Sequence, residues 1–318
     1  MQYSKIGNSE VKVSQIAMGG HEYLPNQKSR GFNEDFNLAI KPGYIFEGFG
    51  GENRKQVLRT AFNYGVNFFD VTMDSEKEAI GRNLKEMGTP YDVYIQTRPE
   101  GMVYTYDEYN TKMADYSLLK AEAQRICKLL QRECIDFFNI AFMKSAWEHD
   151  PDYFDKMKVN IERLKKEGLI RFACADTFSG EKTYMHQIKS DAYDVIYINY
   201  NFADCKAKRN VFPLCREKNM GIITRESFMK GNLYHFAKEA NIENNTLVCH
   251  AAIKWLLAQD EIITMVYGSD KPNHVEDALK LVENLKMTEE EEQVISLIKN
   301  TNGFKEYEQK KTKEFLDL

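Results

Sequence analysis

The feature of this 318-residue sequence that most restricts its fold is a regular alternation between short apolar runs and longer amphipathic stretches. The amphipathic stretches have a helical period, and several end in glycine, as helices do at their C-caps. The short runs are partly β-branched, which is typical of strands buried in a parallel sheet. There are eight such runs, at residues 13–19, 66–70, 92–97, 135–142, 169–175, 194–200, 221–226 and 263–268.

Eight strand–helix units predict a (β/α)8 TIM barrel, an α/β fold whose active sites lie at the C-terminal ends of the strands. We expect a single barrel domain over residues 1–318, with long loops after strands 1 and 3 and with helices at the C-terminal end. A doubly wound parallel sheet is the alternative, but no G-x-G-x-x-G sequence follows the first strand.

Composition excludes several classes of function. A net charge of −5 gives no broadly basic surface, so we expect no nucleic-acid partner. No run of 18 apolar residues occurs, so no membrane span is expected. The six cysteines form no C-x-x-C pair, which argues against a metal centre and favours reduced thiols. Because no signal peptide is recognisable, we expect a cytoplasmic protein acting on a small molecule; its oligomeric state is not indicated.

Two connections are much longer than is usual between a strand and its helix. Residues 21–51 follow the first strand and residues 99–115 follow the third, and both are rich in aromatic residues such as Tyr23, Phe32 and Tyr44. Long connections are usually functional, and in a barrel these two emerge at the face that carries the site. We expect them to cover a pocket; the alternative is that they only cap the barrel.

Charged and polar residues follow nearly every predicted strand. Asp70 and Arg98 end neighbouring strands, so we expect an ion pair between them, either structural or functional. The residues predicted at the rim are His21, Asp70, Arg98, Glu100, Lys144, Cys174, Asp176, Asn199 to Asn201, Arg225, Glu226 and Tyr267 to Ser269.

Five segments resemble the aldo-keto reductase superfamily, in the order of that family and over nearly the whole chain. The segment GVNFFD is similar to the second strand of the family, and GLIRFACADTF is similar to the fifth. DVIYINYNF, GIITRESFMKGNL and VYGSDKPNHVEDAL resemble the sixth strand, the seventh strand with its loop, and the last phosphate-binding segment.

The resemblance implies reduction of a carbonyl with NADPH, in which a tyrosine gives the proton with help from a lysine, an aspartate and a histidine. Only the aspartate is matched, by Asp70. The tyrosine position falls at or near Ser75, the lysine is Arg98 and the histidine is Ala141. Arginine stays protonated and cannot replace lysine in a proton relay. Ser75 is instead a good candidate for the N-cap of the following helix.

The resemblance also implies positions for an NADP cofactor. The pair that holds the carboxamide aligns with Asp176 and Thr177, a strand-six glutamine aligns with Tyr197, and the stacking tyrosine aligns with Arg225. Two glycine-containing loops remain, MKGNL and GSDKPNH, and they could bind phosphate. Alternatively, they are a retained scaffold with no ligand. The candidates in these loops are Lys230, Gly231, Gly268, Ser269, Lys271 and His274.

Three functions therefore remain open. The first is a divergent NADP(H)-linked oxidoreductase for a small carbonyl or sugar-like substrate, whose acid is His21, Tyr23 or Tyr44. The second is an isomerase, epimerase or lyase that uses the charged rim, with Asp70, Glu100, Asp176 and Glu226 as acids or bases. The third is a non-catalytic ligand-binding protein. We favour the first, with Asp70, Arg98, His21 and Tyr44 as catalytic candidates and no metal.

Overall fold

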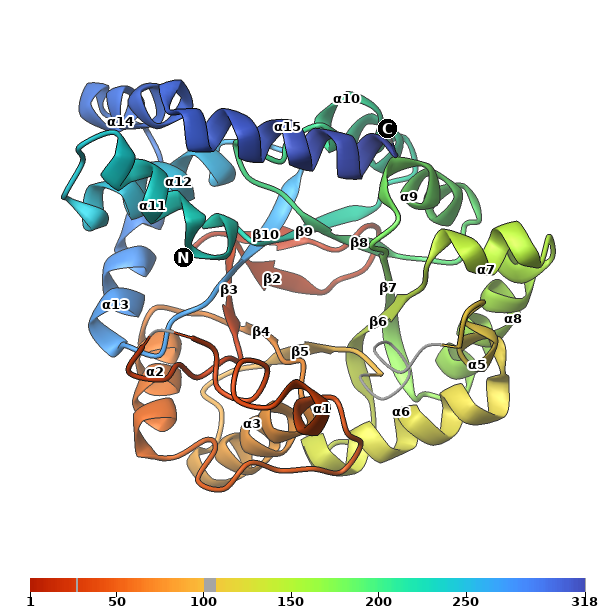
Figure 1. Ribbon diagram of the computed structural model, residues 1–318. Helices are drawn as coiled ribbons and strands as arrows, with labels where there is room; N and C mark the ends of the chain where they lie inside the picture. The colour runs from red at the N-terminus through yellow and green to blue at the C-terminus, as the bar shows by residue number, and fades with distance from the viewer. Residues whose placement is uncertain (27, 100–106, 318) are drawn as a thin grey trace.

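The computed structural model describes residues 1–26, 28–99 and 107–317, and in it eight parallel strands close into a barrel with helices outside (Figure 1). The predicted barrel is confirmed, and all eight predicted runs contribute a strand. Around the barrel the order is β10, β3, β4, β5, β6, β7, β8 and β9. Their bounds are β3 (Ile16–Gly19), β4 (Phe68–Asp70), β5 (Tyr94–Thr97), β6 (Ile135–Ala141), β7 (Ile170–Asp176), β8 (Val195–Asn199), β9 (Gly221–Arg225) and β10 (Ile262–Tyr267).

Helices follow the strands and pack their apolar faces on the outside of the barrel. After β3 to β6 come α1 (Phe36–Ala39), α2 (Glu52–Asn63), α3 (Asp74–Met87), α5 (Thr111–Ala114), α6 (Tyr116–Leu130), α7 (Lys144–His149) and α8 (Tyr153–Lys166). After β7 to β10 come α9 (Gly180–Lys189), α10 (Ala207–Glu217), α11 (Asn232–Glu239), α12 (Asn245–Leu257), α13 (Pro272–Lys280), α14 (Glu289–Asn300) and α15 (Asn302–Leu316), with two short 3-10 turns at Met229–Gly231 and Leu281–Glu283.

An N-terminal hairpin closes the bottom of the barrel, and the sequence analysis did not predict it. Strands β1 (Tyr3–Lys5) and β2 (Lys12–Ser14) pair antiparallel. Ile6 and Val13 from the hairpin are buried in the same cluster as Phe68, Phe137 and Phe172 from the barrel interior. The hairpin therefore fills the N-terminal end of the barrel with apolar side chains, and the opposite end is left for the site.

The long first loop is tied to the start of α3 by side chains of that helix. The Asp74 carboxylate accepts a hydrogen bond of 2.6 Å from the N–H of Gly43, and Oγ of Ser75 accepts one of 3.0 Å from the N–H of Phe46. Our prediction that Ser75 is the N-cap was wrong, because α3 begins at Asp74 and Met73 is its N-cap. Ser75 instead holds the loop.

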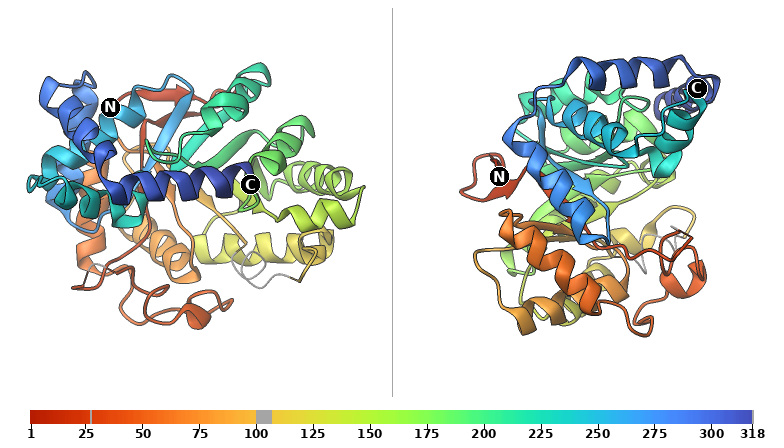
Figure 2. Two further views of the ribbon diagram at one scale, coloured as in Figure 1. Left: turned by 45° about the horizontal axis from the view of Figure 1, so that its top comes forward. Right: turned by 90° about the vertical axis from the view of Figure 1, so that its left-hand side faces the viewer.

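The C-terminal helix α15 lies along the opposite side of the barrel from the first loop (Figure 2). Its end is anchored by an ion pair of 2.5 Å between Asp317 and Lys144, which follows β6. Gly180 at the start of α9 has a φ of +76°, and a Cβ there would lie 2.4 Å from the carbonyl oxygen of Phe315. Close packing of α15 on α9 thus requires glycine at that position.

The second long loop is described only in part. Residues 100–106, which include the candidate Glu100, lie outside the described residues. Within the described parts of the chain, no helix is long and apolar enough to span a bilayer.

Candidate active site

Asp70 is the centre of a polar layer at the C-terminal end of the barrel. It ends β4, and it is only 6% exposed. Its Oδ1 accepts hydrogen bonds of 3.0 Å from both Gln96 and Arg98, and its Oδ2 accepts one of 2.6 Å from Tyr197. The predicted pairing of Asp70 with Arg98 is therefore present. These three donors fix the carboxylate in position.

Tyr197 lies between two guanidinium groups. The guanidinium carbon of Arg98 is 5.1 Å from the centre of its ring, and that of Arg225 is 4.6 Å away. Burial and the nearby Asp70 carboxylate raise the pKa of Tyr197 well above its usual range. Its hydroxyl is thus a hydrogen-bond donor to Asp70, and it is too weak an acid to take over the role of the missing tyrosine.

Arg225 and Asp176 form a second buried ion pair next to Tyr197. The two guanidinium nitrogens Nη1 and Nη2 donate to the two carboxylate oxygens at 2.7 and 2.9 Å, which is a bidentate arrangement. Asn139 donates a further bond of 3.1 Å to the same carboxylate. The Tyr184 hydroxyl lies 3.2 Å from it, but its shortest acceptor is the carbonyl oxygen of Tyr197 at 2.9 Å. Burial by itself lowers the pKa of Arg225, but Asp176 outweighs it and the net shift is upward.

His21 lies two residues after the end of β3 and contacts a glutamate that was not predicted from the sequence. Its Nδ1 is 2.6 Å from Oε1 of Glu76, a residue of α3 that is 2% exposed. The His21 side chain itself is 35% exposed. Burial by itself lowers the pKa of His21, but the Glu76 carboxylate outweighs it and the net pKa is raised. Asp70 raises the pKa further and Arg98 opposes this, so His21 lies within electrostatic reach of that pair.

The backbone around His21 is shaped to receive the Glu76 carboxylate. The N–H of Thr72 donates a hydrogen bond of 2.7 Å to Oε2 of Glu76. A Cβ at Gly20 would lie 2.6 Å from the same oxygen, so this glycine leaves room for the carboxylate. Burial by itself raises the pKa of Glu76, but His21, Thr72 and a nearby arginine lower it overall.

The two tyrosines proposed as acids lie in different surroundings. The Tyr44 ring packs edge-on against Phe46, with ring centres 5.0 Å apart, and no described contact joins Tyr44 to Asp70. Tyr23 is held by a hydrogen bond of 3.0 Å from its N–H to Asp270. Burial and the carboxylates of Glu76 and Asp270 raise the pKa of Tyr23 to about 12. Of the predicted catalytic residues outside the pair, His21 is the one shown within electrostatic reach of both Asp70 and Arg98.

The predicted cofactor residues fall into two groups. Thr177 is buried and bonded within the chain, since its hydroxyl donates to the Phe142 carbonyl at 2.8 Å and accepts from the N–H of Ser179 at 3.0 Å. Asp176 accepts three hydrogen bonds, two from Arg225 and one from Asn139, and Tyr184 lies against the same carboxylate. Neither side chain presents an open hydrogen-bonding group to a carboxamide.

The second group lies at two exposed turns. Lys230 is paired with Glu226 at 3.2 Å, its side chain is 71% exposed, and Gly231 beside it has a φ of +88°. The other turn leads into α13, where Ser269 accepts a hydrogen bond from the N–H of Lys271 at 3.2 Å. Gly268, Lys271 and His274 are exposed. With the N–H groups at the start of the nine-residue helix α13, this turn fits a phosphate group.

Sequence reasoning missed Glu76, Asn139 and Tyr184 as parts of the site. Asn139 could have been found, because it is a polar residue at the inward position that follows Phe137 in β6, whereas the other polar residue of the strand, Asp136, is at an outward position. Glu76 and Tyr184 lie in helices that have ordinary amphipathic patterns, so no signal marked them.

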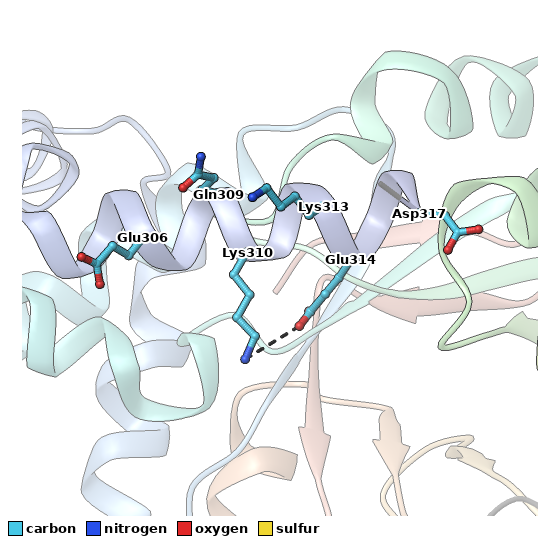
Figure 3. A pocket seen from close by; sticks show the side chains of 6 residues that line it. All are labelled: Glu306, Gln309, Lys310, Lys313, Glu314 and Asp317. Atoms are coloured by element: carbon cyan, nitrogen blue, oxygen red, sulfur yellow. Dashed lines mark ion pairs between the residues drawn. The ribbon is translucent and has the colours of Figure 1, made fainter.

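Two surface hollows lie away from these residues. One, of about 440 Å³, runs along the face of α15 that carries Glu306, Lys310 and Glu314 (Figure 3). The other lies between α2 and α3. Neither contains a predicted site residue. In the described ranges 1–26, 28–99 and 107–317, no three histidine, cysteine or acidic side chains converge as metal ligands would.

Comparison with known proteins settles which family these features represent. The profile of the Aldo/keto reductase family matches residues 46–247, more than half of the chain. The chain belongs to the Aldo/keto reductase family. This confirms the resemblance to the family and places the chain among the oxidoreductases.

Similarity to individual members of the Aldo/keto reductase family is low but extends over the whole chain. The aldo-keto reductase YhdN of Bacillus subtilis (strain 168) is 20% identical, covering 95% of both chains. L-galactose dehydrogenase of Arabidopsis thaliana is 21% identical, covering 92% of this chain and 91% of the other.

Solved structures of the family share the fold. The holo form of aldo-keto reductase AKR11C1 from Bacillus halodurans superposes with a TM-score of 0.67 at 17% identity, covering 94% of this chain and 96% of the other. Glycerol dehydrogenase AKR11B4 from Gluconobacter oxydans gives a TM-score of 0.68 at 16% identity, covering 95% and 96%. At such identities the likeness supports the barrel fold.

Proposed function

We propose that this chain is an NADP(H)-linked oxidoreductase for a small carbonyl or sugar-like substrate, in which His21 supplies the proton usually given by a tyrosine. The observation that carries the proposal is the contact of 2.6 Å between His21 Nδ1 and Glu76 Oε1, beside the Asp70–Arg98 pair. A proton donor, a buried base behind it and a fixed cation beside it are the groups that carbonyl reduction needs.

His21 is suited to give a proton near neutral pH. Its ordinary pKa of 6.5 is raised by Glu76, so the imidazolium persists to higher pH than in a free histidine. Because Glu76 engages Nδ1, the proton available to a substrate is the one on Nε2. In the opposite direction, alcohol oxidation, neutral His21 accepts the proton. Glu76 stays ionised in both cases and holds the ring in place.

Arg98 is suited to stabilise negative charge on the carbonyl oxygen. Its guanidinium is buried, bonded to Asp70 at 3.0 Å and packed on the Tyr197 ring. A cation fixed before the reaction costs no reorganisation when charge develops on the substrate, so it lowers the barrier more than a mobile one. Arg98 thus takes an electrostatic role that does not require it to lose a proton.

A bound NADPH would supply the hydride. We propose that its phosphates bind at the two exposed turns, which carry Lys230 and Lys271 and the N-terminus of α13. The residues are Lys230, Gly231, Gly268, Ser269, Lys271 and His274. Asp176 and Thr177 act indirectly, since Asp176 fixes the flat guanidinium of Arg225 against Tyr197, where it can pack against a planar ring.

The substrate class follows from the polar character of the site and from the relatives. The barrel end presents His21, Arg98, Asn199 and Arg225, a set of hydrogen-bonding groups that suits hydroxylated molecules. Two relatives are named for L-galactose and glycerol dehydrogenase activities. The isomerase alternative needs free carboxylates, and both Asp70 and Asp176 are occupied by ion pairs.

Calorimetric titration with NADPH and NADH, followed by cofactor oxidation assays with a panel of small aldehydes, ketones and sugars, tests the proposal. We expect NADPH to bind in the micromolar range and the wild type to turn over at least one polar carbonyl. His21→Gln should bind the cofactor normally and lose most of the turnover, whereas the exposed His235→Gln is the matched control and should retain it. Absence of cofactor binding would overturn the proposal.

A further inference from the structure

We propose that Arg54, on α2, is a positioning residue: its guanidinium is the buried counter-charge that keeps Glu76 ionised behind His21. The catalytic meaning of this role depends on the function proposed above, but the electrostatic relationship between the three residues does not.

Arg54 and Glu76 contact consecutive residues of the chain just before His21. Nη2 of Arg54 donates a hydrogen bond of 2.7 Å to the carbonyl oxygen of Gly19, the last residue of β3. The next residue, Gly20, is the one whose Cβ would lie 2.6 Å from Oε2 of Glu76. The guanidinium and the carboxylate thus lie against neighbouring residues of the chain, Gly19 and Gly20, and His21 is the next residue.

Arg54 carries its charge in the protein interior, away from water. The residue is 5% exposed, and its Nη1 is buried with no hydrogen-bond partner among the described residues. A buried arginine that makes one hydrogen bond to a carbonyl is costly unless nearby negative charge compensates for the lost hydration. A purely structural anchor for α2 could be provided by a neutral donor at lower cost.

The compensating groups come from α3, from the first loop and from the turn before α13. Burial lowers its pKa, and the groups that act in the opposite direction are, in order, Glu76, Glu22, Tyr23 and Asp270. Glu76 is the strongest of them, and Arg54 in turn lowers the pKa of Glu76. The interaction is therefore reciprocal, as two opposite charges require.

Removing the Arg54 charge should shift the pKa of His21 in a direction that can be stated in advance. The groups that face His21 are Glu76, Asp70 and Arg98. Without Arg54, the negative charge of Glu76 is less compensated, and the proton on His21 becomes harder to remove. The midpoint of the His21 titration should therefore rise. If Arg54 only held the backbone in place, its loss would loosen the His21–Glu76 contact, and the midpoint would fall towards 6.5.

The test is an NMR titration of the His21 Cε1–H signal, assigned by its absence in His21→Gln, in wild type, Arg54→Met and Arg54→Lys. We expect a higher midpoint in Arg54→Met and a wild-type midpoint in Arg54→Lys, which keeps the charge. Arg59→Met is the matched control, because Arg59 is on the same helix, 52% exposed and paired with Glu52; it should leave the midpoint unchanged.

A lower or unchanged midpoint in Arg54→Met would overturn the proposal. If Arg54→Met does not fold, Arg54→Gln replaces it with the same expected direction. The titration uses neither cofactor nor substrate, so it can succeed even if the protein proves not to oxidise NADPH. The failure of this inference and the failure of the proposed function are therefore distinguishable.

Discussion

The hydroxyl of Tyr197 on β8 donates a hydrogen bond of 2.6 Å to Oδ2 of Asp70 on β4, across the barrel. These two strands are opposite one another in the closed order, so the bond links the two sides of the barrel. Together with Arg98 and Arg225, it forms a polar layer above the apolar interior. A substrate bound at His21 would contact this polar layer.

Tyr197→Phe tests the strength of this cross-barrel link. The change leaves one carboxylate oxygen of Asp70 without its buried donor, which should lower the free energy of unfolding by about 1–3 kcal/mol in urea denaturation. The matched control is Tyr200→Phe. Tyr200 is also fully buried, but its hydroxyl has no partner among the described residues, so its removal should be neutral or stabilising. An equal decrease in the free energy of unfolding in the two variants would contradict the assigned role of the Tyr197–Asp70 bond.

Glu76→Gln should lower the pKa of His21. The amide keeps the shape of the side chain but removes the charge that outweighs burial, so the pKa should fall to or below 6.5. The folded state is also affected. Because the pKa of His21 is raised in the folded state, its contribution to stability is fully present below pH 6.5. Because the pKa of Glu76 is lowered in the folded state, its contribution is fully present above pH 4.5. The variant should therefore lose most stability between these values, as urea denaturation at several pH values can show.

Gly20→Ala should disturb the His21–Glu76 pair, whereas its neighbour Gly19→Ala should not. A Cβ at Gly20 would lie 2.6 Å from Glu76 Oε2 and 3.0 Å from a methyl carbon of Val71. A Cβ at Gly19 would meet its nearest atoms at an ordinary 3.5 Å. We expect Gly20→Ala to cost about 1–3 kcal/mol in thermal or urea unfolding and to lower the pKa of His21. If Gly20→Ala and Gly19→Ala had the same stability and the same pKa of His21, the site would tolerate the methyl group and the prediction would be wrong.

Asp204 should make the protein less stable as pH rises. Burial raises its pKa to about 7, and Glu226 and Glu314 add to this while Lys311 opposes it. The folded state therefore binds a proton that the unfolded state releases near pH 3.8, so stability falls between pH 3.8 and about 7. The effect is at most about 4 kcal/mol.

Asp204→Asn should remove this dependence and stabilise the protein at pH 8, measured by urea unfolding at pH 5 and pH 8. Asp191→Asn is the control, because Asp191 is exposed and paired with Lys218; it should change stability by less than about 0.5 kcal/mol. Parallel pH profiles for wild type and Asp204→Asn would show that Asp204 is charged in the folded protein at neutral pH.

The barrel could be predicted because its eight strands are continuous apolar runs, which parallel burial on both faces imposes. The hairpin of β1 and β2 was missed because its strands have only three residues each, and those of β1 are partly exposed. The Asp70–Arg98 pair could be predicted because neighbouring strands bring their ends together. The Arg225–Asp176 pair joins β9 to β7 across β8, and only the length and inward direction of the side chains decide such a contact.

Only one partner of the His21–Glu76 contact, His21, could be predicted from the sequence. His21 stood out because it follows directly on a strand end, and Asp70 did so for the same reason. Glu76 was hidden in the sequence EKEAIGRNLKEMG, which is an ordinary amphipathic pattern, and the long first loop gave no indication of which of its residues would return to the barrel. Tyr44, predicted as a catalytic candidate, packs on Phe46 of the same loop.

The most direct test of the account is the pH dependence of kcat/KM for NADPH-linked carbonyl reduction by wild type and Glu76→Gln. If His21 is the acid, activity in the wild type should persist above pH 6.5 and then decline, because the pKa of His21 is raised. In Glu76→Gln the decline should move to lower pH and match the His21 midpoint measured by NMR. A profile that is the same in both proteins would contradict the assignment of His21 as the proton donor.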